Sequence, residues 1–147
     1  MATTKQQRSQ ARLAHLSVET QGSNHIVNIT EPLREIVASM SLHNGTLICF
    51  VTGTTAGLTV IEDEPGVIED LQDALERLAP TVAEYAHERT AGDGNGHSHV
   101  RAAFLGPSLA IPVIKGQMTL GTWQQVVLVD CDVKPRRREV IVQGLGD

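Results

Sequence analysis

Aromatic side chains are scarce in this sequence. Phe, Tyr and Trp make up only 3% of its 147 residues, so a packed core must be built from Val, Ile, Leu and Ala. A chain of this length fits one domain and buries roughly 68–70% of the surface that its unfolded state exposes, which allows a core without disulfide staples. Hydrophobic residues at 41% and charged residues at 20% are an ordinary balance for a globular protein.

Cysteine is almost as rare, with only two in the chain. Cys49 lies inside an apolar run and Cys131 lies between two aspartates. This placement favours buried free thiols over a disulfide. Because no Cys-x-x-Cys pair is present, a zinc–thiolate site has no support.

Long apolar runs and an excess of basic residues are also missing. No stretch approaches the ~20 apolar residues that span a bilayer, and the first residues, MATTKQQRSQARLAHLS, lack the apolar segment of a secretory signal. We therefore expect a soluble, cytoplasmic protein with no membrane partner. The formal net charge of −5 argues against a nucleic-acid partner. It leaves room for a local basic pocket that binds a phosphorylated small molecule.

The remaining pattern predicts one α+β domain. Residues 1–10 are interpreted as a polar, flexible tail and residues 11–147 as the domain. Apolar residues at helical spacing predict two main helices, which begin near Thr30 and near Pro65. Alternating and continuous apolar runs predict strands over residues 12–20, 25–29, 46–52, 58–61, 98–105, 108–114, 118–130 and 139–143. The run 46–52 is expected to be covered on both faces. Segregated helices and strands indicate a mostly antiparallel, sandwich-like sheet.

A polar pattern stands out in the segment NGHSHVRAAFLGPSL, which begins at Asn95. If residues 98–105 form a strand, His97, His99 and Arg101 share one face, because alternate residues of a strand point the same way. Two imidazoles could then hold one metal ion, and the guanidinium could grip a phosphate or carboxylate. The same residues would also fit a solvent-facing strand edge on which Arg101 forms a salt bridge. The basic run 134–138 is interpreted as a charged turn between strands.

Several blocks of the sequence resemble one family. They are Ser98-His99, Leu105-Gly106, Ser108-Leu109, Pro112, Lys115-Gly116 and Gly121-Thr122-Trp123-Gln124, with a further block GTTAGLTVIEDEPGVIEDL that contains Glu62 and Asp70, and the pair Tyr85 and His87. In order and spacing they are similar to the motifs of the YjbQ-like family, also called the secondary thiamine-phosphate synthase family. One position departs from the common pattern, because Gly53 stands where much of the family has a histidine. A variant branch shares this difference and carries His97 as well.

The resemblance implies an α+β, sandwich-like fold that assembles as a homotrimer. It also implies a thiamine-phosphate synthase activity, which joins a hydroxymethylpyrimidine pyrophosphate to a thiazole phosphate and releases pyrophosphate. Loss of pyrophosphate requires positive charge near the departing oxygens, from a metal ion or from Arg and Lys. A divalent cation, Zn or Mg, is therefore the expected cofactor.

The family motifs and this chemistry together suggest roles for particular residues. Glu62, His87, His97 and His99 are the candidate metal ligands, with Asp70 as an outer member. The candidate catalytic residues are Glu62, His99 and Arg101. The candidate substrate-binding residues are Thr54, Thr55, Lys115 and Trp123. Because the acidic block and the histidines lie far apart in the sequence, we expect a site shared between subunits.

Structural explanations compete with several of these roles. Glu62 precedes a helix start, where acidic residues are favourable, and Asp70 fits a solvated helix face. Trp123 suits packing at a subunit contact as well as stacking on a pyrimidine ring. The same histidines and carboxylates would also serve a metal-dependent hydrolase of a small phosphorylated or ester substrate. A non-catalytic trimer that binds a metal or an anion is the third alternative.

Overall fold

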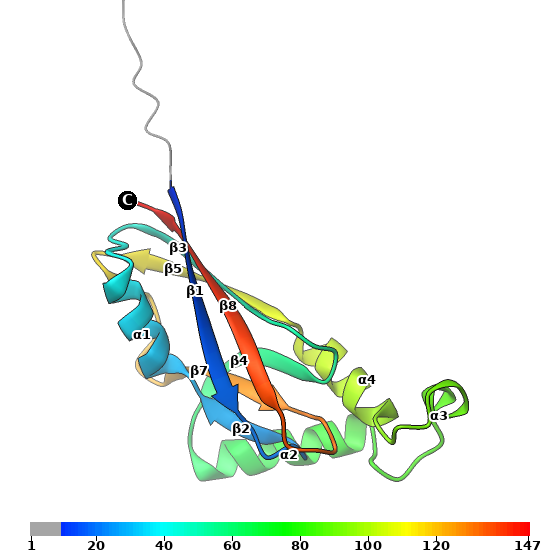
Figure 1. The fold of residues 1–147 in the computed structure, drawn as a ribbon. Helices are drawn as coiled ribbons and strands as arrows, with labels where there is room; N and C mark the ends of the chain where they lie inside the picture. Colours follow the sequence, from blue (N-terminus) through cyan, green and yellow to red (C-terminus); the bar gives the residue numbers. More distant parts are fainter. Residues whose placement is uncertain (1–9) are drawn as a thin grey trace, which may run out of the picture.

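The computed structural model describes residues 10–147, which form two antiparallel sheets and four helices (Figure 1). Within the described residues, the strands are β1 (Gln10–Glu19), β2 (His25–Asn28), β3 (Gly45–Val51), β4 (Ala56–Glu62), β5 (Ser108–Ile114), β6 (Gln117–Met118), β7 (Gln124–Asp130) and β8 (Arg137–Gly146). The helices are α1 (Thr30–Ser39), α2 (Pro65–Leu78), α3 (Ala86–Thr90) and α4 (Gly96–Leu105). The predicted α+β class with a mostly antiparallel sheet is confirmed. The predicted tail lies outside the described residues except for Gln10, where β1 begins.

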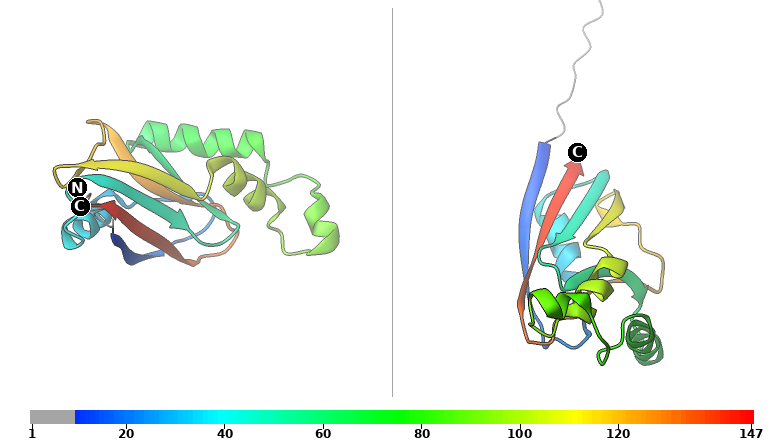
Figure 2. Two further views of the ribbon diagram at one scale, coloured as in Figure 1. Left: turned by 90° about the horizontal axis from the view of Figure 1, so that it is seen from above. Right: turned by 90° about the vertical axis from the view of Figure 1, so that its right-hand side faces the viewer.

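The two sheets pack face to face, and α2 adds a third layer (Figure 2). The larger sheet has the order β1-β8-β3-β5-β6 and the smaller one the order β2-β7-β4, with every neighbouring pair antiparallel. The core between the sheets is aliphatic, and α1 inserts Leu33 and Val37 into it. Helix α2 covers the other face of the small sheet with Leu71 and Leu75.

Strand β7 is the strand that is covered on both faces. Residues Val126 to Val129 are all 0% exposed. Val126 and Leu128 face the core between the sheets, while Val127 and Val129 face α2. The sequence predicted this environment for residues 46–52 instead. That prediction is wrong for β3, because Phe50 on its outer face is 44% exposed.

The two main helices occur where their apolar spacing predicts them. Helix α2 begins with Pro65 at its first turn, where a missing N–H costs nothing. The Glu64 side chain caps it by accepting a hydrogen bond from the Val67 amide. The Asn28 side chain accepts a hydrogen bond from the Thr30 amide at the start of α1.

The predicted strand 98–105 is wrong, because these residues belong to helix α4. The polar and apolar residues alternate there, but Ala, Leu and Arg are also good helix formers. The deciding contact is tertiary: α4 lies against β4, and a Cβ on Gly57 would lie 2.5 Å from the Leu105 Cβ. Gly106, with φ +86°, ends the helix. The predicted strand 118–130 is also divided, since β6 ends at Met118 and β7 begins at Gln124.

Both cysteines are free and buried, as the sequence predicts. Burial raises the pKa of Cys49 and of Cys131 to about 12. We expect neither thiol to react with Ellman's reagent at pH 8 in the native protein, because thiolate is the reacting form. Both thiols should react once the chain is unfolded in guanidinium. Release of one equivalent of chromophore under native conditions within minutes would contradict the burial seen here.

Across residues 10–147, no helix is both long enough and apolar enough to cross a membrane.

Candidate metal and ligand site

The helical conformation of α4 separates the three residues that a strand would place on one face. Successive helix residues turn by about 100°, so His97 and His99 point to roughly opposite sides. His97 and Arg101 are buried, with 5% and 2% of their surfaces exposed, whereas His99 is half-buried and lines an open cavity. The predicted shared face of His97, His99 and Arg101 is therefore wrong.

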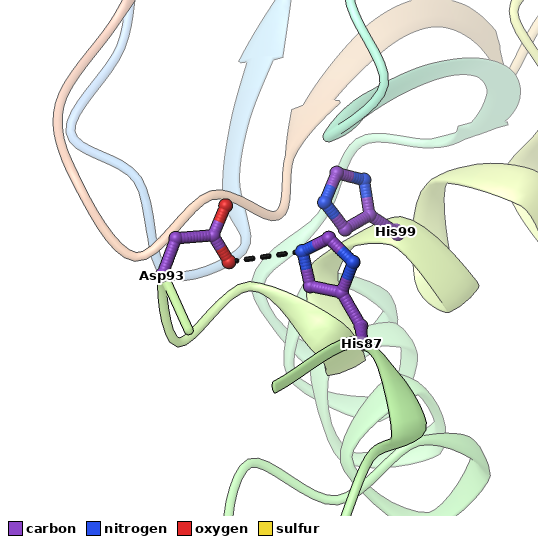
Figure 3. Close-up of side chains that lie close together, drawn as sticks. All are labelled: His87, Asp93 and His99. Atoms are coloured by element: carbon purple, nitrogen blue, oxygen red, sulfur yellow. Dashed lines mark hydrogen bonds and ion pairs between the residues drawn. The ribbon is translucent and has the colours of Figure 1, made fainter. Parts of the chain in front are cut away.

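His99 meets two residues from the preceding segment of the chain (Figure 3). His87 lies on α3, and Asp93 lies in the loop between α3 and α4. One possible ligand atom from each of the three side chains lies within 4.8 Å of the others. The His87 and His99 rings are 4.5 Å apart, and His87 Nε2 is 3.0 Å from Asp93 Oδ1. We call His87, Asp93 and His99 the triad.

The hydrogen bonds of His99 determine which of its nitrogens is free. Its Nδ1 lies 3.1 Å from the Thr54 carbonyl oxygen. Because a carbonyl only accepts hydrogen bonds, Nδ1 is the donor nitrogen, and in the neutral imidazole the lone pair is on Nε2. Nε2 is buried and has no hydrogen-bond partner among the described residues. Histidine ligands of metals commonly donate their second N–H to a backbone carbonyl in this way.

The contacts of Asp93 favour its ionised form, which is the form that can bind a metal ion. The Asn95 backbone N–H donates to its carboxylate, and this bond, followed by the hydrogen bond and charge of His87, lowers the pKa of Asp93. Two imidazoles and one carboxylate are a ligand set typical of catalytic zinc sites. Magnesium prefers oxygen ligands only, so the triad fits Zn²⁺ better than Mg²⁺. Three protein ligands leave coordination positions open for water or substrate.

A cavity of about 510 Å³ adjoins the triad. His99 and Asp93 form one side of it. Asn95 and Asp132 also line it, and the remaining lining comes from the turn between β3 and β4, which adjoins His99, and from the start of β8: Thr52, Gly53, Thr54, Thr55, Arg136, Arg137, Arg138 and Glu139. This volume falls in the range of small-molecule sites.

Beneath the cavity lies a buried ion pair between Asp130 and Arg138. The Arg138 guanidinium donates through Nε and Nη2 to the two Asp130 oxygens, each at 2.8 Å. Thr20 donates a third hydrogen bond to Asp130, and Thr55 accepts one from Arg138. Burial by itself raises the pKa of Asp130, but the hydrogen bonds from Arg138 and Thr20 outweigh it and lower this pKa.

Thr54 and Thr55 are thus the predicted substrate-binding residues that lie beside His99. The other predicted residues lie elsewhere in the chain. Glu62 is at the opposite end of β4 from Ala56, about 20 Å away at ~3.3 Å per residue. There it lines a separate cavity with Trp123. Asp70 is exposed on α2, and Lys115 is exposed in the turn between β5 and β6.

His97 has the features of a core residue. Its ring lies 6.2 Å from the ring of Tyr85. Burial, followed by the positive charge of Arg101, lowers the pKa of His97, so the imidazole is neutral at pH 7. It is not part of the triad. Of the four predicted metal ligands, only His87 and His99 therefore lie together within one chain. Asp93, which was not predicted, lies with them.

Arg101 anchors the chain segment that follows α2. Its Nε and Nη2 donate to the Ala79 carbonyl at 3.0 and 2.8 Å, and Nη2 lies 2.5 Å from Glu76. Hydrogen bonds from Thr81, first its backbone N–H, together with Arg101 lower the pKa of Glu76 to about 2. None of these contacts faces the cavity.

We therefore expect Arg101→Lys to change stability and not ligand binding. A lysine cannot reproduce the planar fork, and an unsatisfied buried carbonyl costs about 1–3 kcal/mol. Urea unfolding should show a loss of about 2 kcal/mol, while zinc content stays unchanged. Arg34→Lys, at an exposed position on α1, is the matched control and should lose less than about 0.5 kcal/mol. Unchanged stability combined with lost phosphate affinity would contradict this and show that Arg101 contributes to ligand binding.

Two residues of this site, Asp93 and Arg138, are not indicated by the motifs of the sequence. Asp93 lies in the glycine-rich loop AGDGNG, whose acidic residue is the available signal. Arg138 was assigned to a charged turn, although it is a buried residue of β8. Its signal is the alternation Arg138, Val140, Val142, which marks the inward face of that strand.

Comparison with known proteins places this architecture in one family. A UPF0047 protein of Archaeoglobus fulgidus is 35% identical over 130 residues, which cover 88% of this chain and 98% of the relative. A UPF0047 protein of Mycobacterium tuberculosis is 39% identical over 125 residues, which cover 85% of this chain and 91% of the relative. A crystal structure of a YbjQ-like protein of unknown function from Sulfolobus solfataricus P2 superimposes with a TM-score of 0.90 at 29% identity. This match covers 95% of this chain and all 100% of the other. The family described as UPF0047 protein YjbQ-like matches residues 14–147, and the chain therefore belongs to it.

Proposed function

We propose that this protein is a zinc-dependent enzyme that acts on a small phosphorylated molecule at the triad. The single observation that carries the proposal is the orphaned Nε2 of His99, which is buried, has no hydrogen-bond partner among the described residues and belongs to a side chain that clusters with His87 and Asp93. A structural histidine in this position would pair with a donor. An unpaired buried acceptor beside a second imidazole and a carboxylate is better explained by a bound cation.

The first reaction to test is the thiamine-phosphate synthase reaction that the family resemblance suggests. A divalent ion supplies positive charge near a departing pyrophosphate when it is bound. The chain's own residues hold that ion and fix its position. The Thr54 carbonyl orients the His99 ring, and the Asn95 amide keeps Asp93 ionised and in place.

Hydrolysis of a single phosphorylated or ester substrate is the second candidate. It is supported by the open coordination positions that three protein ligands leave, because catalytic zinc sites use such a position for water. Metal binding without turnover is the third outcome that the assay distinguishes.

The test combines metal analysis with paired assays. Protein purified in metal-free buffers and then loaded should hold about one zinc ion per chain, measured by elemental analysis. Hydroxymethylpyrimidine pyrophosphate and thiazole phosphate together should then yield product and pyrophosphate, and chelation should stop the reaction. Product from either compound alone, with water as acceptor, would support the hydrolase instead. Substoichiometric zinc with full activity would contradict the metal site.

We also propose that the protein assembles as a homotrimer, with copies of this chain covering the outer face of the large sheet. No helix of the described residues lies over this face. Exposed apolar side chains gather on it, among them Leu13 (59%), Phe50 (44%) and Ile114 (55%). Static light scattering should give three times the chain mass of 15.8 kDa at micromolar concentration. A monomer mass there would exclude both the trimer and any site shared between subunits.

A further inference from the structure

We propose that the turn Gly53–Thr55 and the Arg138 guanidinium form a binding site for the phosphoryl group of the substrate. The proposal rests on the proposed function, because the site adjoins the triad across one cavity and defines what that enzyme binds. It replaces Arg101 and Lys115, which the sequence suggested for this role and which do not line the cavity.

The first observation is an unused donor on a buried cation. Arg138 is only 7% exposed. Its Nε and Nη2 are bonded to Asp130 and Thr55, but among residues 10–147 no hydrogen bond involves Nη1. Nη1 lies beside Gly53, since a Cβ on Gly53 would be 2.9 Å from it. Both residues line the cavity, so the glycine leaves this donor uncovered.

The second observation concerns the backbone of the turn. Within the described part of the chain, the N–H groups of Gly53, Thr54 and Thr55 donate no hydrogen bond. The flanking residues do take part in sheet pairing, Thr52 just beyond the end of β3 and Ala56 as the first residue of β4. Gly53 and Thr54 are exposed, so their N–H groups are open to the cavity, whereas Thr55 is buried, where an N–H group is normally paired. Successive unpaired N–H groups next to a cation are the elements from which proteins build anion sites.

Most of the charged side chains around the cavity are paired with other residues, and the donor left for a bound anion is Arg138 Nη1. Three arginines and three carboxylates line it. Asp132 is buried and accepts from Thr55, Arg136 and the Lys134 amide. Glu139 pairs with His15, and Asp93 belongs to the triad. The carboxylates are therefore already engaged, while Arg138 Nη1 is not. A dianion with several acceptor oxygens, such as a phosphoryl group, matches the available donors better than a planar carboxylate.

Gly53 is the residue on which the test depends. Its φ of +102° disfavours any side chain, and the added Cβ of Gly53→Ala would press against Arg138 Nη1. Gly106→Ala is the matched control. Gly106 has a similar positive φ of +86°, but a Cβ there meets nothing within 4 Å. Both variants place a side chain at a positive φ, and only Gly53→Ala puts its Cβ against the proposed site.

The experiment is titration of inorganic phosphate and pyrophosphate by calorimetry, in metal-free and in zinc-loaded protein. We expect Gly53→Ala to weaken the binding of pyrophosphate at least tenfold in the metal-free protein. Gly106→Ala should bind pyrophosphate with the same affinity as the wild type. Acetate should bind more weakly than phosphate to the wild type. Absence of phosphate binding at millimolar concentration, equal affinity in Gly53→Ala, or acetate binding as tightly as phosphate would overturn the proposal.

A second measurement decides the matter if Gly53→Ala does not fold. In wild-type protein labelled with ¹⁵N, phosphate should shift the amide resonances of Gly53, Thr54 and Thr55 and the side-chain resonance of Arg138. Lys115 and Gly116 serve as internal references and should not move. Shifts centred elsewhere would refute the site. Phosphate binding without zinc binding would refute the zinc enzyme alone, whereas zinc binding without phosphate binding would refute this site alone.

Discussion

His99→Ala is expected to abolish stoichiometric zinc binding while the fold remains intact. His99 supplies the one triad atom that is buried and unpaired, and its ring is already oriented by the Thr54 carbonyl. Loss of residues that only support a ligand typically lowers metal affinity 10–100-fold, so loss of the ligand itself should cost at least about 100-fold. Zinc affinity measured by competition with a chromogenic chelator, together with elemental analysis, checks this result.

Two histidine controls separate metal binding from folding. His43→Ala changes an exposed histidine outside the triad and should leave zinc affinity and stability unchanged. His97→Ala removes a buried ring next to Tyr85, and should lower stability by about 1–3 kcal/mol with little change in zinc affinity. One full equivalent of zinc retained by His99→Ala would remove the triad as a metal site. Greater loss of zinc in His97→Ala than in His99→Ala would show that His97, and not His99, is the metal ligand on α4.

Asp130→Asn should cause a large loss of stability. Asp130 is 0% exposed and neutralises Arg138, and the amide keeps its size but removes its charge. Breaking a buried ion pair from one side typically costs about 3–5 kcal/mol. We expect the lower end, about 3 kcal/mol, because Asp132 lies 3.8 Å from the same guanidinium. Urea unfolding at pH 7 measures the difference. Glu19→Gln, at an exposed pair with Arg137, is the control and should change stability by less than about 1 kcal/mol.

The ion pair between Asp130 and Arg138 also predicts how stability depends on pH. The pKa of Asp130 in the folded protein lies below its ordinary value of 3.8. The unfolded chain therefore takes up a proton first as the pH falls, and the contribution of the pair is complete above about pH 4 and lost below it. The stability difference between wild type and Asp130→Asn should accordingly shrink between pH 4 and pH 2. A difference that stays constant over this range would mean that the charge of Asp130 does not stabilise the fold.

Local pattern predicted much of the scaffold of this protein. An aliphatic core, free buried cysteines, the helices that begin near Thr30 and Pro65, and the strands over 25–29 and 108–114 all appear in the structure. The motif blocks predicted the family, which the comparison confirms. These features depend on residue type and on spacing over one or two turns, and both can be read from a single sequence.

The segment 96–105 shows where local pattern is insufficient. Its alternation of polar and apolar residues fits a strand, and its composition also fits a helix. Packing against Gly57 selects the helix, and this choice rotates His97 and Arg101 into the protein while His99 faces the cavity. The functional interpretation of all three residues changed with the conformation of one short segment.

The site itself depends on contacts between segments that are distant in sequence. His99 is joined to Thr54 across 45 residues, and Arg138 to Thr55 across 83. The sequence by itself determined the residue types available, the core, and most of the strands and helices. Only the tertiary structure decided that His87, Asp93 and His99 meet, that Glu62 and Lys115 lie apart from them, and that Arg138 lies behind Gly53. The reason is that strand pairing and helix packing set these distances through long-range contacts, which no local period encodes.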